Sequence, residues 1–243
     1  MEYGNLGDLT ISGSGSAGGG SFRRVSISGS GSVRGDVACA SCKVSGSARI
    51  DGALKAEEGK ISGSAHITGD AEIGALSVSG SAHIDGNVRS GPLHVSGSTR
   101  IGGSMDAGEA HISGELSTGG GCSAETFRAS GVVRIGGLLN ADTVELHLHS
   151  HGSSAKEIGG GRILVEHGEP SFIGSLFAGF TGRGPLLTTD VVEGDDIALE
   201  GTKANVVRGR RVAIGEGCEI GLVEYGESFT RDDGALVRES KKL

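Results

Sequence analysis

Three histidines close together form the densest group of metal-binding side chains in the chain. They alternate with other residues in the run His147-Leu-His-Ser-His151, so in a strand all three imidazoles would lie on one face. Residues two apart in a strand are separated by about 6.8 Å at Cα, so one neighbouring pair could chelate a metal ion, whereas the outer two could not join it. Because no fourth ligand is evident, we expect an exposed strand here and no metal site.

Cys39 and Cys42 form a C-x-x-C motif, which is typical of one half of a zinc site or of a redox pair. No second C-x-x-C occurs in the sequence, and the repeat described below assigns both cysteines to inward-facing positions. We therefore expect buried free thiols. The two other cysteines, Cys122 and Cys218, do not complete a disulfide framework of the kind found in secreted proteins.

The segment Gly13-Ser-Gly-Ser-Ala-Gly18 matches the dinucleotide-binding fingerprint G-x-G-x-x-G in form only. The glycines of that fingerprint open a helix onto the phosphates, and no helical pattern follows them here. A chain with 47 glycines matches such a motif by chance, and it contains no Gly-Lys-Ser/Thr phosphate loop. We expect no nucleotide, no other cofactor and no catalytic residue.

Basic side chains recur at two positions of the same repeat, and both columns should face outward. Such columns could attract an acidic partner or lipid headgroups. Acidic residues are mixed among them, which favours an ordinary solvated face; these are Glu57, Glu58, Glu72 and Asp106. Like charges on successive levels would lie about 4.8 Å apart, and histidine at some levels avoids that repulsion at pH 7. The columns contain Arg49, His66, His83, Arg100 and Arg134, and Lys43, Lys60, His94, His111 and Arg128.

The element that must position all these residues is a 17-residue repeat, clearest over 61–69, 78–86 and 95–103. Apolar and polar residues alternate within each copy, as in a half-buried strand, and glycines mark the corners. Ordering one coil costs more than its own apolar burial returns, so coils must stack. The sequence predicts an all-β, single-stranded parallel β-helix (a solenoid) with about 17 residues per coil and a triangular cross-section. Its core ladder would contain Ile27, Val44, Ile61, Val78, Val95 and Ile112, with Ile50, Ile67, Ile84 and Ile101.

Composition excludes several classes of protein. The net charge is −8 and the pI is ≈ 5.5, so the chain as a whole offers no basic surface to a nucleic acid. The first residues lack the basic and apolar regions of a secretory signal. No apolar run reaches the roughly 18 residues of a membrane-spanning helix. We expect a cytoplasmic protein.

We expect five segments: 1–8 as an N-terminal leader, 9–167 as the main β-helix array, 168–189 as an apolar insert or loop, 190–227 as C-terminal β-helix coils, and 228–243 as a charged tail or cap. The insert has apolar residues at helical spacing. It could lie on a bilayer surface, dock on a partner, or pack as a flap over the solenoid. The candidate contact residues are Phe172, Ile173, Leu176, Phe177 and Phe180.

The coil motif Ser-Gly-Ser-Ala-x-Ile-x-Gly, its 17-residue step and the missing nucleotide motif resemble the bactofilins, bacterial polymer-forming cytoskeletal proteins. Segments 192–197, 206–209 and 217–225 resemble the longer, Gram-positive members of that family. The resemblance implies a right-handed β-helix that assembles end to end into filaments without nucleotide.

We therefore expect a structural scaffold and not an enzyme. Only eight residues precede Leu9, too few for a substantial cap, so the unpaired backbone of the end coil should bind another copy and give a homopolymer. The alternative is a scaffold without filaments that recruits partners or binds the membrane surface, at the inner face of the cell membrane or on envelope-associated proteins. A hexapeptide-type acyltransferase is less favoured, because its coils close about every 18 residues and it needs a projecting catalytic histidine.

Overall fold

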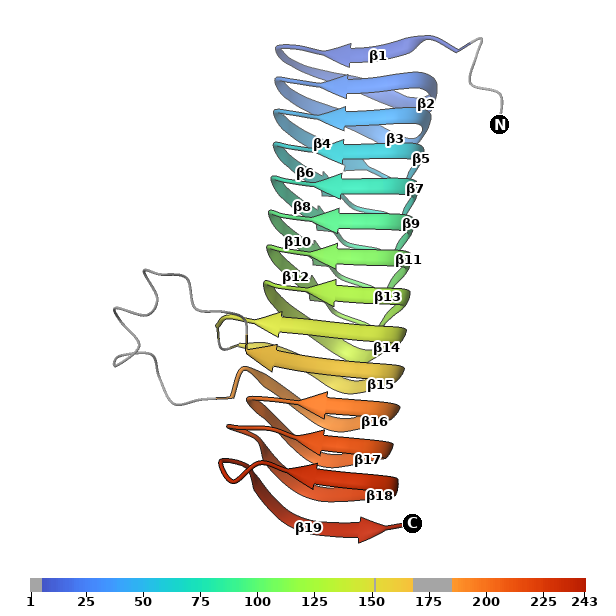
Figure 1. Ribbon diagram of the computed structural model, residues 1–243. Helices are drawn as coiled ribbons and strands as arrows, with labels where there is room; N and C mark the ends of the chain where they lie inside the picture. Colours follow the sequence, from blue (N-terminus) through green and yellow to red (C-terminus); the bar gives the residue numbers. More distant parts are fainter. Residues whose placement is uncertain (1–5, 151, 168–184) are drawn as a thin grey trace, which may run out of the picture. The chain divides into compact units, whose positions relative to one another are not determined.

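The computed structural model describes residues 6–150, 152–167 and 185–243. Every regular element in this part of the chain is a β-strand (Figure 1). Within it no helix is long and apolar enough to cross a membrane. The chain divides into two compact units, Met1–Ala124 (unit 1) and Glu125–Leu243 (unit 2). In each unit the strands are parallel and pair with strands one turn further along the chain, so the predicted all-β parallel solenoid is confirmed.

Unit 1 begins with three strands and continues as an alternation of short and longer ones. Each short strand pairs with the next short strand, and each longer strand with the next longer one. The predicted 17-residue offset separates the partners, as in Ile50↔Ile67 and Ile61↔Val78. The strands are β1 (Asp8–Ile11), β2 (Ser14–Ile27), β3 (Ser30–Val44), β4 (Ser47–Asp51), β5 (Leu54–Ile61), β6 (Ser64–Ile67), β7 (Ala71–Val78), β8 (Ser81–Ile84), β9 (Val88–Val95), β10 (Ser98–Ile101), β11 (Met105–Ile112) and β12 (Glu115–Thr118).

The core of unit 1 is a stack of aliphatic side chains that alternate with outward-facing residues. Each fully buried valine or isoleucine contributes roughly 1.5–3 kcal/mol of hydrophobic stabilisation. Because partners in adjacent turns are directly paired, each turn covers the apolar side chains of the next. The following ten side chains are at most 3% exposed: Ile27, Val44, Ile61, Val78, Val95, Ile112, Ile50, Ile67, Ile84 and Ile101.

The Ser-Gly-Ser corners of unit 1 stack backbone directly on backbone. The amide of Ser79 donates to the carbonyl of Ile61, and that of Ser81 donates to the carbonyl of Gly63, both at 2.8 Å. A Cβ atom added to Gly80 would overlap the carbonyl oxygen of Gly63. Only glycine fits this corner, which accounts for the glycine recurring there in successive turns.

Unit 2 is a solenoid with longer strands and a variable step. The offset in sequence between paired residues is 19 at Leu139↔Ile158, 15 at Val192↔Val207, 16 at Val207↔Val223 and 17 between the last two strands. The boundary between the units lies in β13 (Cys122–Ala129). The further strands are β14 (Val132–Leu148), β15 (Ser153–His167), β16 (Leu187–Leu199), β17 (Thr202–Ile214), β18 (Glu219–Arg231) and β19 (Leu236–Lys242).

Two segments that the sequence analysis expected to be an insert and a tail or cap contain strand residues. β16 begins at Leu187, a fully buried residue within the expected insert 168–189. β19 lies within the expected tail or cap 228–243 and pairs in parallel with β18. The charged side chains of β19 are exposed, and backbone pairing does not require apolar side chains.

Candidate functional site

One end of unit 1 has backbone that no described residue pairs. β1 pairs with residues 24–27 of β2, while residues 14–20 of β2 pair only with β3. We call β1 together with residues 14–20 the N-terminal edge. Asp8 is its single charged residue, and its carboxylate lies 2.8 Å from the guanidinium of Arg23. An edge in which most residues are small and uncharged is a template for pairing with another strand.

Individual backbone groups of the N-terminal edge can be assigned to its free side. The carbonyls of Gly7 and Ile11 accept hydrogen bonds from β2 and from the corner after it, and that of Gly13 accepts one from Ser30. Successive residues of a strand direct their N–H and C=O groups to alternate sides. The amides of Thr10 and Ser16 therefore face away from the intramolecular ladder.

The far end of unit 2 is chemically different. β19 pairs with residues 219–225 of β18, and no described strand pairs with its other side. Leu236 and Leu243 are 57% and 66% exposed, but charged side chains dominate the strand. Charged residues on an edge strand oppose pairing with a second strand. They are Arg238, Glu239, Lys241 and Lys242.

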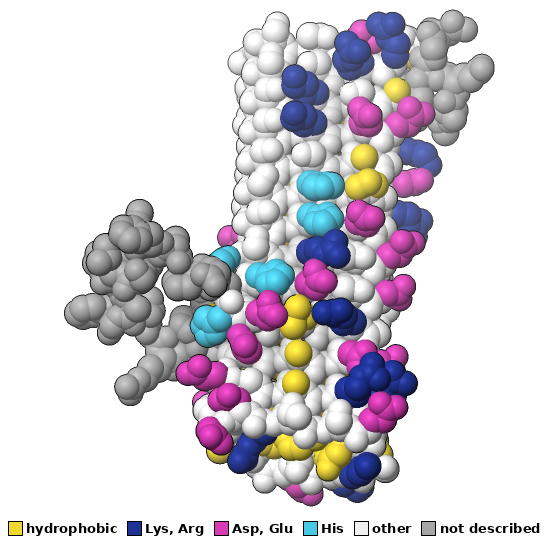
Figure 2. Space-filling model, in the orientation of Figure 1, with side chains coloured by type: hydrophobic (Ala, Val, Ile, Leu, Met, Phe, Trp, Pro, Cys, Tyr) yellow, Lys and Arg dark blue, Asp and Glu magenta, His cyan; other side chains and the backbone are white. Residues whose placement is uncertain are grey.

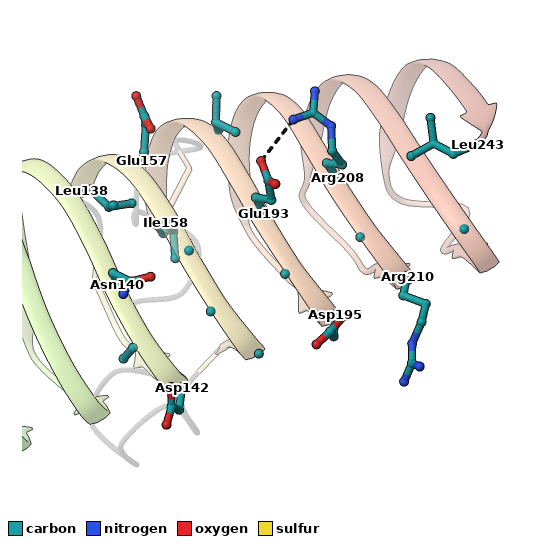
Figure 3. Close-up of a pocket in the computed structure, with 18 residues that line it drawn as sticks. Leu138, Asn140, Asp142, Glu157, Ile158, Glu193, Asp195, Arg208, Arg210 and Leu243 are labelled. Atoms are coloured by element: carbon teal, nitrogen blue, oxygen red, sulfur yellow. Dashed lines mark hydrogen bonds and ion pairs between the residues drawn. The ribbon is translucent and has the colours of Figure 1, made fainter.

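Unit 2 also contains a surface groove of ≈ 800 Å³ (Figure 3). Its floor includes Gly160, Gly194 and Gly209, which pair with one another on successive turns. One rim carries Glu157, Glu193 and Arg208, and the guanidinium of Arg208 lies 3.1 Å from Glu193. The other carries Asp142, Asp195 and Arg210. Among the described residues that line the groove, none is a serine, threonine, cysteine, histidine or lysine, and the acidic ones are Asp142, Glu157, Glu193 and Asp195.

The cysteines of the C-x-x-C motif are buried and free. Cys39 and Cys42 are 0% and 3% exposed, and their thiols are hydrogen-bonded to each other. That hydrogen bond lowers the pKa of Cys39 and, together with burial, raises the pKa of Cys42 well above its ordinary value. No described histidine, aspartate or glutamate completes a metal site around them.

The structure describes only part of the histidine run between His147 and His151. The Nδ1 atom of His147 lies 3.3 Å from a carboxylate oxygen of Glu166, on the following turn. His151 lies outside the described residues, and so do the five candidate contact residues between Phe172 and Phe180. The prediction of a membrane or partner contact there stays a prediction.

The first basic column of unit 1 forms a network that the sequence did not indicate. Arg49, His66, His83 and Arg100 occupy equivalent positions on successive turns. Asp85 lies between the two histidines and accepts hydrogen bonds from both imidazoles, at 3.0 Å from His66 and 2.9 Å from His83. The hydrogen bond from His66 is the main cause that lowers the pKa of Asp85. The signal that could have identified Asp85 is the spacing His83-x-Asp85, which places both residues on one face of the strand.

The second basic column contains another histidine pair. His94 and His111 pair on adjacent turns, with ring centroids 5.1 Å apart and nearly parallel rings. The nearest carboxylate oxygen of Glu109 is 3.8 Å from His111, outside hydrogen-bond distance. Figure 2 shows that charged and histidine side chains stand in narrow columns, separated by surface without charged side chains.

Comparison with known proteins identifies the family of the N-terminal part of the chain. Residues 4–89 match the family model of Bactofilin, described as polymer-forming cytoskeletal. This segment belongs to the bactofilin family. It extends from before β1 into β9 and includes the N-terminal edge, the C-x-x-C motif and the cluster around Asp85.

Two relatives of the bactofilin-like chain come from Bacillus subtilis (strain 168). The uncharacterized protein YhbF is 41% identical over 91 residues, which cover 37% of this chain and 35% of YhbF. The uncharacterized protein YhbE is 49% identical over 59 residues, which cover 24% of this chain and 25% of YhbE. The chain thus spans between a quarter and about a third of the length of these relatives. No solved structure matches the chain.

Proposed function

We propose that this protein is a cytoskeletal scaffold that polymerises end to end in the cytoplasm, without nucleotide and without enzymatic activity. The observation that carries the proposal is the N-terminal edge, which lies within the bactofilin segment and whose backbone groups on the free side have no partner among the described residues. A second copy pairs with this edge by β-augmentation, either through its own N-terminal edge or through the backbone of β19, and a filament requires a contact at each end of the chain's solenoid.

The size of the edge decides how it can bind. Each backbone hydrogen bond contributes about 1 kcal/mol net, whereas association costs about 4–15 kcal/mol in lost translational and rotational freedom. The four residues of β1 alone are too few to offset that cost. Stable assembly therefore requires pairing over both parts of the edge, β1 and residues 14–20 of β2.

The experiment compares wild type with the double variant Thr10→Pro/Ser16→Pro by electron microscopy and sedimentation, with and without ATP or GTP. Proline removes the two amides assigned to the free side and leaves the intramolecular ladder its donors. We expect nucleotide-independent filaments for wild type and small species for the variant. Circular dichroism and the melting temperature should show that the variant is folded.

The matched control is Thr10→Ser/Ser16→Thr, which changes the same positions and keeps both amides, so it should polymerise like wild type. Strictly monomeric wild type at high concentration would contradict polymer formation. Filaments that persist in the proline variant would contradict the assignment of the contact to the N-terminal edge.

A second candidate property is peripheral binding to the membrane or to envelope-associated proteins. It rests on the sequence of the apolar insert, with its three phenylalanines between residues 172 and 180. Liposome flotation of wild type should exceed that of Phe177→Asp if the insert is an anchor, because burying a carboxylate in the apolar part of a bilayer is costly. Equal flotation of the two proteins counts against the anchor and leaves polymer formation untouched.

A further inference from the structure

A cluster of three potential metal ligands lies on the surface of unit 1. His66 of β6 pairs directly with His83 of β8, and their rings meet edge to face at a centroid distance of 4.9 Å. Asp85 follows the last residue of β8 and lies on the same face as His83. The two imidazoles thus come from equivalent positions on adjacent turns, and the carboxylate comes from the next outward position along the strand.

The distances within the cluster suit a single ion. The ligand atoms of the three residues all lie within 4.8 Å of one another. The Nε2 atoms of His66 and His83 lie 3.0 Å and 2.9 Å from the carboxylate oxygens of Asp85. Two ligand atoms at about 2.0–2.1 Å from one Zn²⁺ are separated by about 2.9–3.4 Å. Two of the three separations therefore already have the required size, and the side chains are between 36% and 46% exposed, so the third can adjust by rotation.

From this geometry we propose that His66, His83 and Asp85 bind a divalent transition-metal ion such as Zn²⁺. Imidazole nitrogen and carboxylate oxygen are ligands that such ions accept, in contrast to the all-oxygen sets typical of Mg²⁺ and Ca²⁺. Three ligands at an exposed position leave the remaining coordination sites to water. The site is part of the bactofilin segment and does not depend on the proposed polymer.

Arg49 opposes this site and makes the proposal specific. Its guanidinium lies 2.8 Å from Nδ1 of His66 and also contacts Asp51 at 2.6 Å. When Nε2 of neutral His66 binds a metal ion, Nδ1 carries the proton and cannot accept from Arg49. Metal binding therefore breaks one hydrogen bond and places a second cation near the ion. Removing the guanidinium should strengthen binding.

The other histidine pair of unit 1 provides an internal control. His94 and His111 also pair on adjacent turns, at a similar ring distance. Their neighbour Glu109 lies 3.8 Å from His111 and forms no hydrogen bond to it. Among the described residues, only the cluster of His66, His83 and Asp85 brings three such ligand atoms together.

The experiment is calorimetric titration of the untagged full chain with Zn²⁺, followed by electron paramagnetic resonance with Cu²⁺ to count nitrogen ligands. We expect one ion per chain and two coordinating nitrogens. His83→Ala and Asp85→Asn should each weaken Zn²⁺ binding at least about tenfold. Arg49→Gln should tighten it by a factor of roughly 10–100, the range that corresponds to one hydrogen bond to a charged group that metal binding no longer has to break.

The double variant His94→Ala/His111→Ala should bind Zn²⁺ like wild type. Three results would overturn the proposal: affinity unchanged in both His83→Ala and Asp85→Asn, affinity lost in the His94→Ala/His111→Ala control, or a Cu²⁺ spectrum without nitrogen coupling. All the substituted side chains are on the surface of the solenoid, so each variant should fold. Circular dichroism of each variant verifies this.

Discussion

Unit 1 and unit 2 build the same kind of solenoid by different means. From β3 onward, unit 1 repeats a 17-residue step and stacks glycine corners backbone on backbone. Unit 2 changes its step from turn to turn, and its Arg208 and Arg211 each pair with acidic residues on both neighbouring turns. Both keep one uninterrupted column of buried aliphatic residues, as in Val192, Val207 and Val223 of unit 2. The buried column is thus the common requirement, and a regular corner is one way to satisfy it.

The largest expected effect concerns two glycines, one in each unit, that differ in the space around them. In Gly80→Ala the new Cβ atom overlaps the carbonyl oxygen of Gly63, which is fixed backbone, so we expect a loss of about 1–3 kcal/mol of unfolding free energy. In Gly226→Ala of unit 2 the nearest atom to the new Cβ is 3.7 Å away, in ordinary contact. That variant should remain within about 1 kcal/mol of wild type. Denaturant unfolding measures both, and equal losses would contradict the contrast.

A smaller difference concerns salt. Arg211 of unit 2 is paired with Asp196 on the preceding turn and with Glu227, at 3.3 Å, on the following one. Arg211→Ala should speed amide hydrogen exchange in β16–β18 at low salt, and the effect should fade at about 1 M salt, where screening acts over about 3 Å. The control is Lys55→Ala of unit 1, which removes a single exposed pair with Glu72 and should change little. Equal effects of the two variants would contradict the expected difference between an arginine paired on both neighbouring turns and a single exposed ion pair.

The smallest effect near neutral pH is that of the buried thiols, which matter for stability only at high pH. Burial raises the pKa of Cys122 in unit 1 to about 12 and that of Cys218 in unit 2 to about 11. A thiol of the unfolded chain ionises near its ordinary value of 9.0. Above that pH the unfolded state binds fewer protons than the folded state, so stability falls as pH rises from about 9 toward the folded pKa values.

We expect Cys122→Ala to flatten the fall in unfolding free energy between pH 9 and the pKa of about 12. Alkylation of the folded protein should reach Cys218 before Cys122, because its thiolate forms at lower pH. The reverse order of labelling, read by mass spectrometry, would contradict the assigned difference between the two units.

The fold class could be predicted from the sequence because the side chains of unit 1 follow the period of its strands and turns. The alternation around Val78 and Ile84 and the 17-residue step together specify a strand, a corner and a stacked turn. Where side chains carry no pattern, the backbone still pairs. Residues 14–20 are glycine, serine and alanine and show no alternation, yet they form part of β2. β19 is a second example, because its charged residues show no apolar alternation although its backbone pairs with β18.

The candidate metal site shows a different limit of the sequence. Reading the columns one at a time placed His66 and His83 on a solvated face and overlooked Asp85, which belongs to another column. Its carboxylate reaches both imidazoles only because parallel turns bring position 85 beside position 66. The contact between Asp85 and His66 joins residues of different columns on adjacent turns. It can be found only when the turns are stacked, and not by reading one column at a time.

The glycine corner also makes the length of unit 1 adjustable in whole turns. Since Gly46, Gly63, Gly80 and Gly97 meet the preceding corner in the same way, excising residues 62–78 would join equivalent positions and preserve the register. Each such excision or duplication alters the stack by one strand spacing, about 4.8 Å. A duplication or deletion of about 51 nucleotides in the gene would therefore change unit 1 by one whole turn.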